Sequence, residues 1–211
     1  MQLINNLDDA LVRAKQLLQK NQKRGVIGIV GKPGAGKSTL TSHLINNLPK
    51  DSAVLIPMDG YHLSNKQLAR LGVSNRKGAF DTFDSHGFVE LLKRINEEPT
   101  KDIYFPIFHR EIEESYAADG VVPANTKLVI TEGNYLLLDK GGWERVRAEL
   151  DEVWYIEIDD AIRIERLTKR HQSFGKNYED AISWATGSDE RNAELVKKTR
   201  DKADVIIEIK Q

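Results

Sequence analysis

The first absence in this sequence is cysteine, which does not occur among its 211 residues. The chain can therefore form no disulfide and no thiolate metal site, although this alone does not fix a cellular compartment. None of the 5 histidines belongs to an H-E-x-x-H pair, so we expect no zinc site.

An excess of charge of one sign is also absent, since 31 Lys and Arg nearly balance 32 Asp and Glu. No global electrostatic field then favours nucleic acid or an anionic membrane. No apolar run approaches the length that spans a membrane, and residues 1–9 lack the basic and apolar regions of a secretory signal. We expect a cytoplasmic protein without nucleic-acid or membrane partners.

What the sequence does contain is a phosphate-binding pattern, because residues 31–38 read G-x-x-x-x-G-K-S. The backbone N–H groups of such a loop curl round a polyphosphate at close range, which a Cβ atom at Gly31 or Gly36 would obstruct. Lys37 can then reach the β- and γ-phosphates, and the Ser38 hydroxyl can bind Mg²⁺. The predicted nucleotide contacts in and beside the loop are Gly31, Lys32, Pro33, Gly34, Ala35, Gly36, Lys37, Ser38 and Thr39.

The residues that flank the loop support this interpretation over a chance match in a glycine-rich turn. Residues 26–30 form a short apolar run suited to a buried strand, and residues 38–48 carry leucine and isoleucine at helical spacing. Strand, loop and helix N-terminus therefore follow in the required order. The positive end of the helix dipole adds to the attraction for phosphate.

Hydrophobic periodicity predicts alternating strands and helices along a single domain that spans residues 1–211. Further strands are expected at 53–58, 127–131, 153–158 and 205–209. Helices are expected within 1–21 (from Leu3 to near Lys20) and at 85–97, 142–150, 160–172 and 189–200. The fold class that follows is α/β, a three-layer sandwich around a mostly parallel sheet.

Two stretches, 60–83 and 99–126, look irregular and are rich in polar and aromatic residues. In parallel sheets such excursions lie near the carboxyl ends of the strands, where ligands bind. In the second stretch, His109 and Arg110 could bind polar or anionic parts of an acceptor, with Phe108 and Tyr104 as an apolar wall. A packed loop histidine is an equal alternative. Residues 76–84 have a similar mixture, in which Asp84 is also a plausible helix cap.

Two acidic residues directly follow apolar strands. Asp59 could accept the proton of an attacking hydroxyl or position Mg²⁺, and the alternative is an acid that caps the turn before Gly60. Glu132 stands where phosphate-loop proteins place an acid that holds Mg²⁺ directly or through water. Its alternative is a solvated glutamate at a strand end. Ser38 and Glu132 are thus the predicted metal ligands.

Three arginines follow a helical spacing, since Arg163, Arg166 and Arg170 stand at i, i+3 and i+7. This spacing predicts guanidinium groups along one helical face. A small helical lid near 163–178 could close them over the phosphates and spread the charge of the transition state. The alternative is a solvated helix face that pairs with neighbouring acids, namely Asp159, Asp160 and Glu165.

Taken together, these motifs resemble the superfamily of uridine kinase, phosphoribulokinase and type I pantothenate kinase, a group of P-loop kinases. The resemblance covers most of the chain, roughly residues 22–209. The chain looks most like a nucleoside/nucleotide kinase-like branch, some members of which are called fructose-transport-system kinases. Beyond the loop, the motifs that carry the resemblance are Met58-Asp59-Gly60-Tyr61-His62, Arg76-Lys77-Gly78, Asp81-Thr82-Phe83-Asp84, Pro106-Ile107-Phe108-His109-Arg110 and Thr131-Glu132-Gly133-Asn134-Tyr135.

The resemblance implies ATP and Mg²⁺ as cofactors. It implies Asp59 as the catalytic carboxylate, supported by Lys37 and Arg166, and it favours Arg166 and Arg170 as lid contacts to the nucleotide. Asn192 looks like a recurring position near the nucleotide or the acceptor. The acceptor site that follows from the motifs comprises Asp59, Tyr61, His62, Arg76, Lys77, Phe83, His109, Arg110 and Asn134.

The resemblance transfers the substrate least well. Uridine kinases have a different segment where His109 and Arg110 stand, and pantothenate kinases have a longer C-terminal region than this chain. We predict an ATP-dependent kinase that transfers the γ-phosphoryl group to a hydroxyl of a small polar metabolite, such as a nucleoside, a sugar or a pantothenate-like alcohol.

Two other functions are weighed against this prediction, and a homodimer is left open. A nucleoside monophosphate kinase would have a phosphate rather than an alcohol as its acceptor. A GTPase-type switch would explain the D-x-x-G pattern at Asp84–Gly87, but the sequence contains no N-K-x-D guanine signature.

Overall fold

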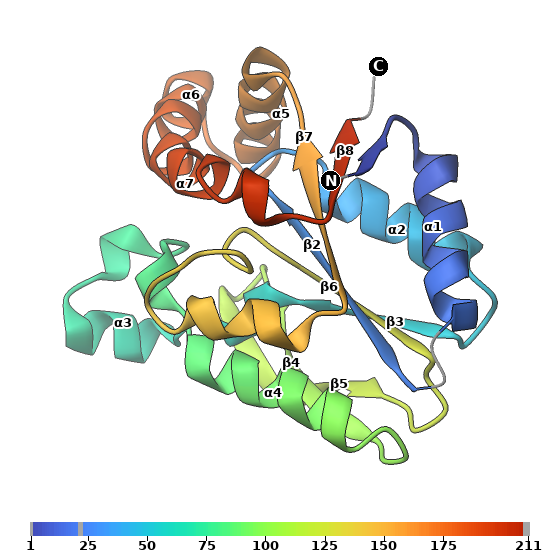
Figure 1. Ribbon diagram of the computed structural model, residues 1–211. Helices are drawn as coiled ribbons and strands as arrows, with labels where there is room; N and C mark the ends of the chain where they lie inside the picture. Colours follow the sequence, from blue (N-terminus) through green and yellow to red (C-terminus); the bar gives the residue numbers. More distant parts are fainter. Residues whose placement is uncertain (1, 21–22, 209–211) are drawn as a thin grey trace.

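The protein is built in three layers, with helices on both faces of a parallel β-sheet (Figure 1). The computed structural model describes residues 2–20 and 23–208. Within these residues the strand order is β1-β8-β7-β2-β6-β3, and every pairing in this sheet is parallel. The strands are β1 (Gln2–Ile4), β2 (Gly25–Gly31), β3 (Ala53–Pro57), β6 (Leu128–Gly133), β7 (Glu152–Glu157) and β8 (Val205–Glu208). The predicted α/β fold class is confirmed.

The helices that cover the sheet fall on its two faces. The helices α1 and α2 pack on one face, and α4 packs on the other together with a 3₁₀ helix, Trp143–Glu149. A separate group of helices, α5 to α7, lies together at one end of the molecule (Figure 1). The bounds are α1 (Leu7–Lys20), α2 (Lys37–Asn47), α3 (Asn65–Leu71), α4 (Ser85–Glu97), α5 (Asp160–Ser173), α6 (Tyr178–Thr186) and α7 (Ser188–Lys197).

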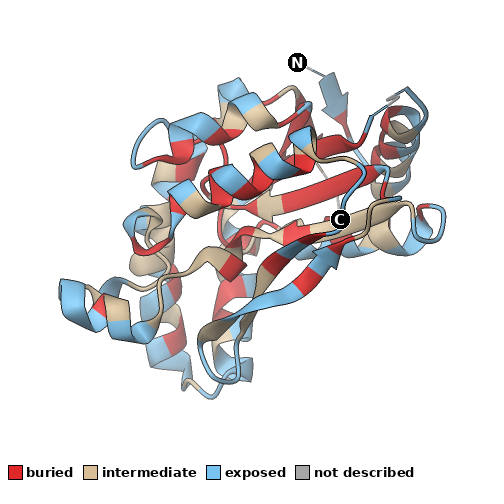
Figure 2. Cartoon of the chain, turned by 90° about the horizontal axis from the view of Figure 1, so that it is seen from below, coloured by how far each residue is buried: buried red, intermediate tan, exposed pale blue. Residues whose placement is uncertain are grey.

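The central strands are buried on both faces, which explains why they read as continuous apolar runs. In β2, Val26 and Val30 join the core on the α4 side, while Ile27 and Ile29 join the core beneath α1 and α2. Figure 2 shows this strand layer as buried between partly exposed helices. The sheet therefore provides a rigid platform, and the loops at its carboxyl edge are held in fixed positions.

The N-terminal helix is shorter than predicted. Leu3 does not belong to it, because Gln2–Ile4 form β1, a parallel edge strand beside β8. The helix begins at Leu7 because Asn6 caps it, accepting a hydrogen bond from the Asp9 amide at 2.8 Å. The apolar spacing continues across this break, so periodicity alone extended the helix too far.

The two irregular stretches hold more secondary structure than expected. The first contains α3, capped by Ser64, which accepts a hydrogen bond from the Gln67 amide. The second is an antiparallel hairpin of β4 (Ile103–His109) and β5 (Glu114–Val122), which forms its own sheet. Its strands were missed because one side is exposed and polar residues interrupt the apolar alternation.

The remaining helices agree with the prediction in place but differ in detail. The segment 142–150 is a 3₁₀ helix rather than an α-helix, and the helix expected to reach residue 200 ends at Lys197. The sequence reasoning missed α6, whose N-terminus is capped by Asn177. Residue 209 of the last predicted strand, and residues 1 and 21 of the predicted N-terminal helix segment, lie outside the described residues. None of the helices described here is long and apolar enough to cross a membrane.

The core on the α4 side makes a testable contribution to stability. Phe88 is fully buried against Tyr61 and Trp143, so Phe88→Ala should lower the free energy of unfolding by about 3–5 kcal/mol. Urea denaturation followed by circular dichroism measures the change. Phe174→Ala is the matched control, since that ring is 61% exposed and should cost less than about 1 kcal/mol. Equal losses in the two variants would contradict this account of the core.

Candidate active site

The glycine-rich loop connects β2 to α2 and has the backbone conformation of a phosphate cradle. Gly34 and Gly36 adopt φ of 79° and 94°, in the left-handed region where a side chain is strained. Gly36 directly precedes the first residue of α2, so the loop opens onto the N-terminus of that helix. Backbone donors and the positive end of the helix dipole meet there, which favours an anionic group.

Lys37 is held across this loop by three oxygen acceptors. Its ammonium donates to the backbone oxygens of Gly31 at 2.9 Å and Lys32 at 3.3 Å, and to Oδ1 of Asn134 at 2.6 Å. Burial lowers the pKa of Lys37 to about 8, although the charges of Glu132 and Asp59 act in the opposite direction. An anionic ligand at the loop would raise this pKa again, because it would stabilise the charged ammonium that burial disfavours.

The two strand-end carboxylates lie beside the loop at the same edge of the sheet. Glu132 is in register with Ile29 of β2 on one side and Pro57 of β3 on the other. Asp59 follows β3 by two residues, within a 3₁₀ turn. The order across the sheet is therefore phosphate loop, Glu132 and Asp59, as the sequence predicts for the carboxyl edge.

The predicted metal ligands are neighbours. The Ser38 hydroxyl donates to Oε1 of Glu132 at 3.4 Å, and burial is the main cause of a raised pKa at Glu132. No cluster of three or more His, Cys, Asp or Glu suited to a metal ion occurs within the described part of the chain. A hydroxyl and a single carboxylate nevertheless fit Mg²⁺, which keeps several waters and takes its other ligands from phosphates.

Asp59 is engaged by the hairpin and by its own turn. Nη2 of Arg110, the residue directly after β4, donates to Oδ2 of Asp59 at 2.9 Å. The backbone oxygen of Asp59 lies 2.7 Å from Nδ1 of His62, whose ring contacts Phe83 and Phe108 with centroids 4.0 and 4.6 Å away. Burial lowers the pKa of His62, which favours the neutral ring.

The three arginines that follow the helical spacing on α5 are of two kinds, buried and exposed. Arg163 is fully buried and donates to Asp160 at 2.8 Å and to Glu190 of α7. The same Asp160 oxygen accepts from the buried ammonium of Lys32 at 2.6 Å, so this network joins the loop to α5 and α7. Arg163 is thus a structural residue: it pairs with Asp160, as the alternative interpretation proposes, but its side chain is buried rather than solvated.

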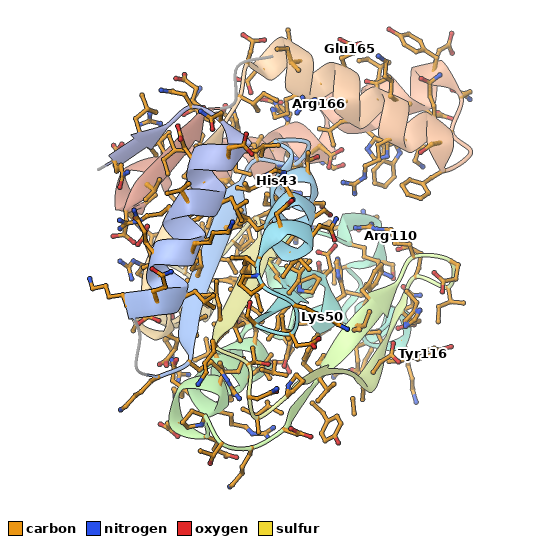
Figure 3. The ribbon with its side chains drawn as sticks, turned by 90° about the vertical axis from the view of Figure 1, so that its right-hand side faces the viewer. His43, Lys50, Arg110, Tyr116, Glu165 and Arg166 are labelled. Carbon is orange, nitrogen blue, oxygen red and sulfur yellow. The ribbon has the colours of Figure 1, made fainter. Side chains whose placement is uncertain are left out.

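Arg166 and Arg170 differ from Arg163 in being exposed on α5. A Cβ atom at Gly36 would lie 3.4 Å from Nη1 of Arg166, so this guanidinium stands directly over the loop. The charge of Arg170 acts on Lys37, which places it near the same site. Figure 3 shows Arg166 on α5 above and Arg110 at the hairpin below, on the same side of the molecule.

The other predicted acceptor residues are only partly brought together. Tyr61 packs edge-on against Phe88 at 5.3 Å, and burial raises the pKa of its hydroxyl. Arg76 pairs with Asp81 at 2.7 Å. Lys77 donates to Asn65 at 2.9 Å and to the backbone oxygen of Glu113, and it lies 5.2 Å from the Phe108 ring.

His109 faces the hairpin rather than Asp59. Its ring nitrogens lie 2.7 Å from Asp119 and 3.0 Å from Glu111, and these contacts raise its pKa. Asn134, which the motifs associated with the acceptor, instead binds the ammonium of Lys37. Its carboxamide oxygen therefore positions Lys37 of the phosphate loop, and a contact of Asn134 with the acceptor stays a prediction.

Sequence reasoning missed several partners that the fold supplies. Glu190 of α7 binds Arg163, and Asp189 of the same helix lies 2.7 Å from Nε2 of His171. The negative charge of Asp189 also reaches Lys37 and Arg170. No local sequence pattern predicts these contacts, because α7 comes to lie beside α5 only after the chain has passed through α6. Asn192, also of α7, reaches the backbone oxygen of Gly78 at 3.5 Å.

Comparison with known proteins agrees with this geometry. The sequence profile of the phosphoribulokinase/uridine kinase family matches residues 26–211. The chain belongs to this family. As a kinase of this family, the protein is an ATP-dependent phosphotransferase that acts on a hydroxyl of a small molecule.

Three relatives illustrate the relationship. A candidate uridine kinase of Schizosaccharomyces pombe is 30% identical, over 97% of this chain and 91% of the relative. A crystal structure of a candidate fructose transport system kinase from Silicibacter sp. TM1040 has a TM-score of 0.86 at 32% identity, covering 95% of this chain and 98% of that one. YFH7 of Saccharomyces cerevisiae, at 20% identity, shares the fold with a TM-score of 0.82 over 98% and 99% of the two chains.

The lowered pKa of Lys37 predicts how nucleotide binding by this kinase depends on pH. Phosphates favour the charged ammonium, which the free protein loses as pH rises through about 8. ATP affinity should be constant from about pH 6.5 to 7.5 and then fall, by up to about tenfold per pH unit. Calorimetric titration across this range measures it. Lys37→Ala should bind more weakly and without this fall, and a fall of equal size in that variant would exclude Lys37 as its cause.

The buried network around Arg163 predicts a cost in stability. Arg163→Met leaves Glu190 without its cation, and the unfolding free energy should drop by about 2–3 kcal/mol. The drop is smaller than for a fully buried pair because Asp160 and Glu190 retain some contact with solvent. Thermal unfolding measures it. Arg191→Met, on an exposed position of α7, is the matched control and should change stability little. A neutral Arg163→Met would show that the network does not support the fold.

Proposed function

We propose that the kinase transfers the γ-phosphoryl group of ATP to an alcohol of a small polar metabolite, with Asp59 as the base. A nucleoside, a sugar and a pantothenate-like alcohol are the candidate classes of acceptor. Names of relatives point in different directions here, since one is a candidate uridine kinase and another a candidate fructose transport system kinase.

One observation carries the proposal: the carboxyl ends of β2, β6 and β3 bring Lys37, Glu132 and Asp59 to one edge of the sheet. Neighbouring strands lie about 4.8 Å apart, so β2 and β3 are about 10 Å apart across β6. That interval suits a phosphoryl group held between a donor at the loop and an acceptor at Asp59.

On the donor side, the loop amides and the ammonium of Lys37 bind the phosphates and orient the γ-phosphoryl group. Arg166, which lies over Gly36, and Arg170 add positive charge from α5 and exclude water, a competing nucleophile. Ser38 and Glu132 would hold Mg²⁺. When bound, this ion supplies positive charge that neutralises the phosphate oxygens.

On the acceptor side, Asp59 orients the alcohol and takes its proton. The alcohol oxygen forms a bond to the γ-phosphorus as the bond from that phosphorus to the ADP oxygen breaks, and the proton passes to the Asp59 carboxylate. Tyr61, His62, Phe83 and Asn134 complete the proposed acceptor contacts, and His109, Arg76 and Lys77 would shape its outer boundary through the hairpin and the loop before α4.

Substitution of the proposed base tests this assignment. Asp59→Asn should leave ATP affinity nearly intact and lower turnover by about 10²–10⁴-fold, because the amide cannot accept the proton. Coupled ADP-release kinetics and a calorimetric ATP titration measure the two quantities. Asp139→Asn is the matched control, because it also removes one carboxylate paired with a cation, at 3.1 Å, outside the site.

Wild-type turnover in Asp59→Asn would remove Asp59 from the base role. Phosphorus NMR of the product adds a second criterion. A phosphate ester supports transfer to an alcohol, whereas a phosphoanhydride would show a nucleoside monophosphate kinase instead.

A further inference from the structure

The acceptor side of the site contains four basic side chains, and one of them differs from the other three in the residue with which it pairs. Arg76 is paired with Asp81, Lys77 with Glu113 and Asn65, and His109 with Asp119 and Glu111. Those partners belong to the hairpin, to α3 or to the loop before α4. Arg110 differs, because its partner is Asp59 itself, at 2.9 Å.

The contact between Arg110 and Asp59 is built into the backbone. A Cβ atom at Gly60 would lie 2.1 Å from the backbone oxygen of Pro106, so the turn that carries Asp59 touches β4 directly. Only glycine allows this approach. The Phe108 ring also lies 5.9 Å from the guanidinium of Arg110. The hairpin therefore holds Arg110 beside Asp59 through contacts that do not depend on the pair itself.

Arg110 keeps most of its hydrogen-bonding capacity available. A guanidinium has five N–H donors, and within the described residues only Nη2 of Arg110 donates to the protein. Its side chain is 47% exposed and that of Asp59 is 36% exposed, so a ligand can reach both. Arginine presents its donors as a planar fork that matches carboxylate and phosphate groups.

The pair also leaves room for an acceptor alcohol on the same carboxylate. In the part of the chain that the structure describes, Arg110 donates only to Oδ2 of Asp59, so Oδ1 can accept the hydrogen bond of an acceptor alcohol while the guanidinium stays beside it. An anionic group on the acceptor would give the guanidinium a second charged partner, with hydrogen bonds stronger than those that a neutral group could form.

We propose that the acceptor is a small anion, an alcohol that also carries a carboxylate or phosphate group, and that Arg110 binds this group. The proposal rests on the proposed function, because Asp59 must be the base that receives the alcohol. The remote charge anchors the acceptor at the hairpin while its hydroxyl faces the γ-phosphoryl group. Arg110 is thereby the residue that selects charged acceptors over neutral ones of the same shape.

Matched pairs of acceptors test the proposal. ADP release is measured with glycerate against glycerol, pantothenate against pantothenol, ribose 5-phosphate against ribose, and fructose 6-phosphate against fructose. At least one anionic member should exceed its neutral partner in kcat/KM by about 10–100-fold, the range expected for hydrogen bonds to a charged group. The carboxylate and phosphate pairs separate the two sources of negative charge.

Variants of Arg110 supply the second readout. Arg110→Gln should bring the ratio within the preferred pair close to one, mainly by raising KM for the anion, and Arg110→Lys should retain part of it. The preferred anion should raise the melting temperature of the wild type but not of Arg110→Gln. Arg145→Gln is the matched control, since that arginine is 44% exposed, pairs with Glu90 at 3.2 Å and should keep the wild-type ratio.

Different outcomes would contradict the role of Arg110 and the proposed kinase function. A neutral acceptor used as well as its anionic partner, or an anion preference unchanged in Arg110→Gln, overturns the role of Arg110 and leaves the kinase assignment intact. Failure of every acceptor, with only slow hydrolysis of ATP, overturns the proposed function and this inference together.

Discussion

The parallel register of β2, β6 and β3 is the constraint on which the site depends. Because neighbouring parallel strands end at the same edge, Glu132 is fixed between the phosphate loop and Asp59 without any contact having to be optimised separately. The buried cores on both faces hold this register, since a shift by one residue would exchange the side chains that pack in the two cores. The stability of the sheet and the alignment of the phosphate loop, Glu132 and Asp59 therefore have one cause.

Charge in the site is arranged in two groups that differ in burial. Lys37 is drawn into the protein, where it is balanced by backbone oxygens and Asn134 rather than by a direct carboxylate pair. Arg166 and Arg170 stay exposed on α5, and their position is set by the buried Arg163 below them. The helix is thus anchored by one arginine and presents two others, so the same spacing in sequence serves two separate purposes.

The sequence allowed prediction of the elements whose signals are local. The strand at 26–30, the glycine loop and Asp59 and Glu132 at strand ends followed from apolar runs and from residues with a specific backbone role. The hairpin was not predicted, because exposed Tyr104 and Tyr116 obscure its alternation. Pairs such as Lys37 with Asn134 also could not be predicted, since 97 positions separate them and only the folded sheet brings them together.

The hairpin of β4 and β5 has no strand pairing with the main sheet within the described residues. It is joined to the rest of the molecule through Ile103, Phe105 and Val122, which belong to the core on the α4 side, and through the approach of Pro106 to Gly60. The outer part of such a unit can change in sequence while the phosphate loop keeps its geometry, provided that these contacts are preserved. Among related kinases, the substrate could then change through replacement of residues in this hairpin, while the phosphate loop stays the same.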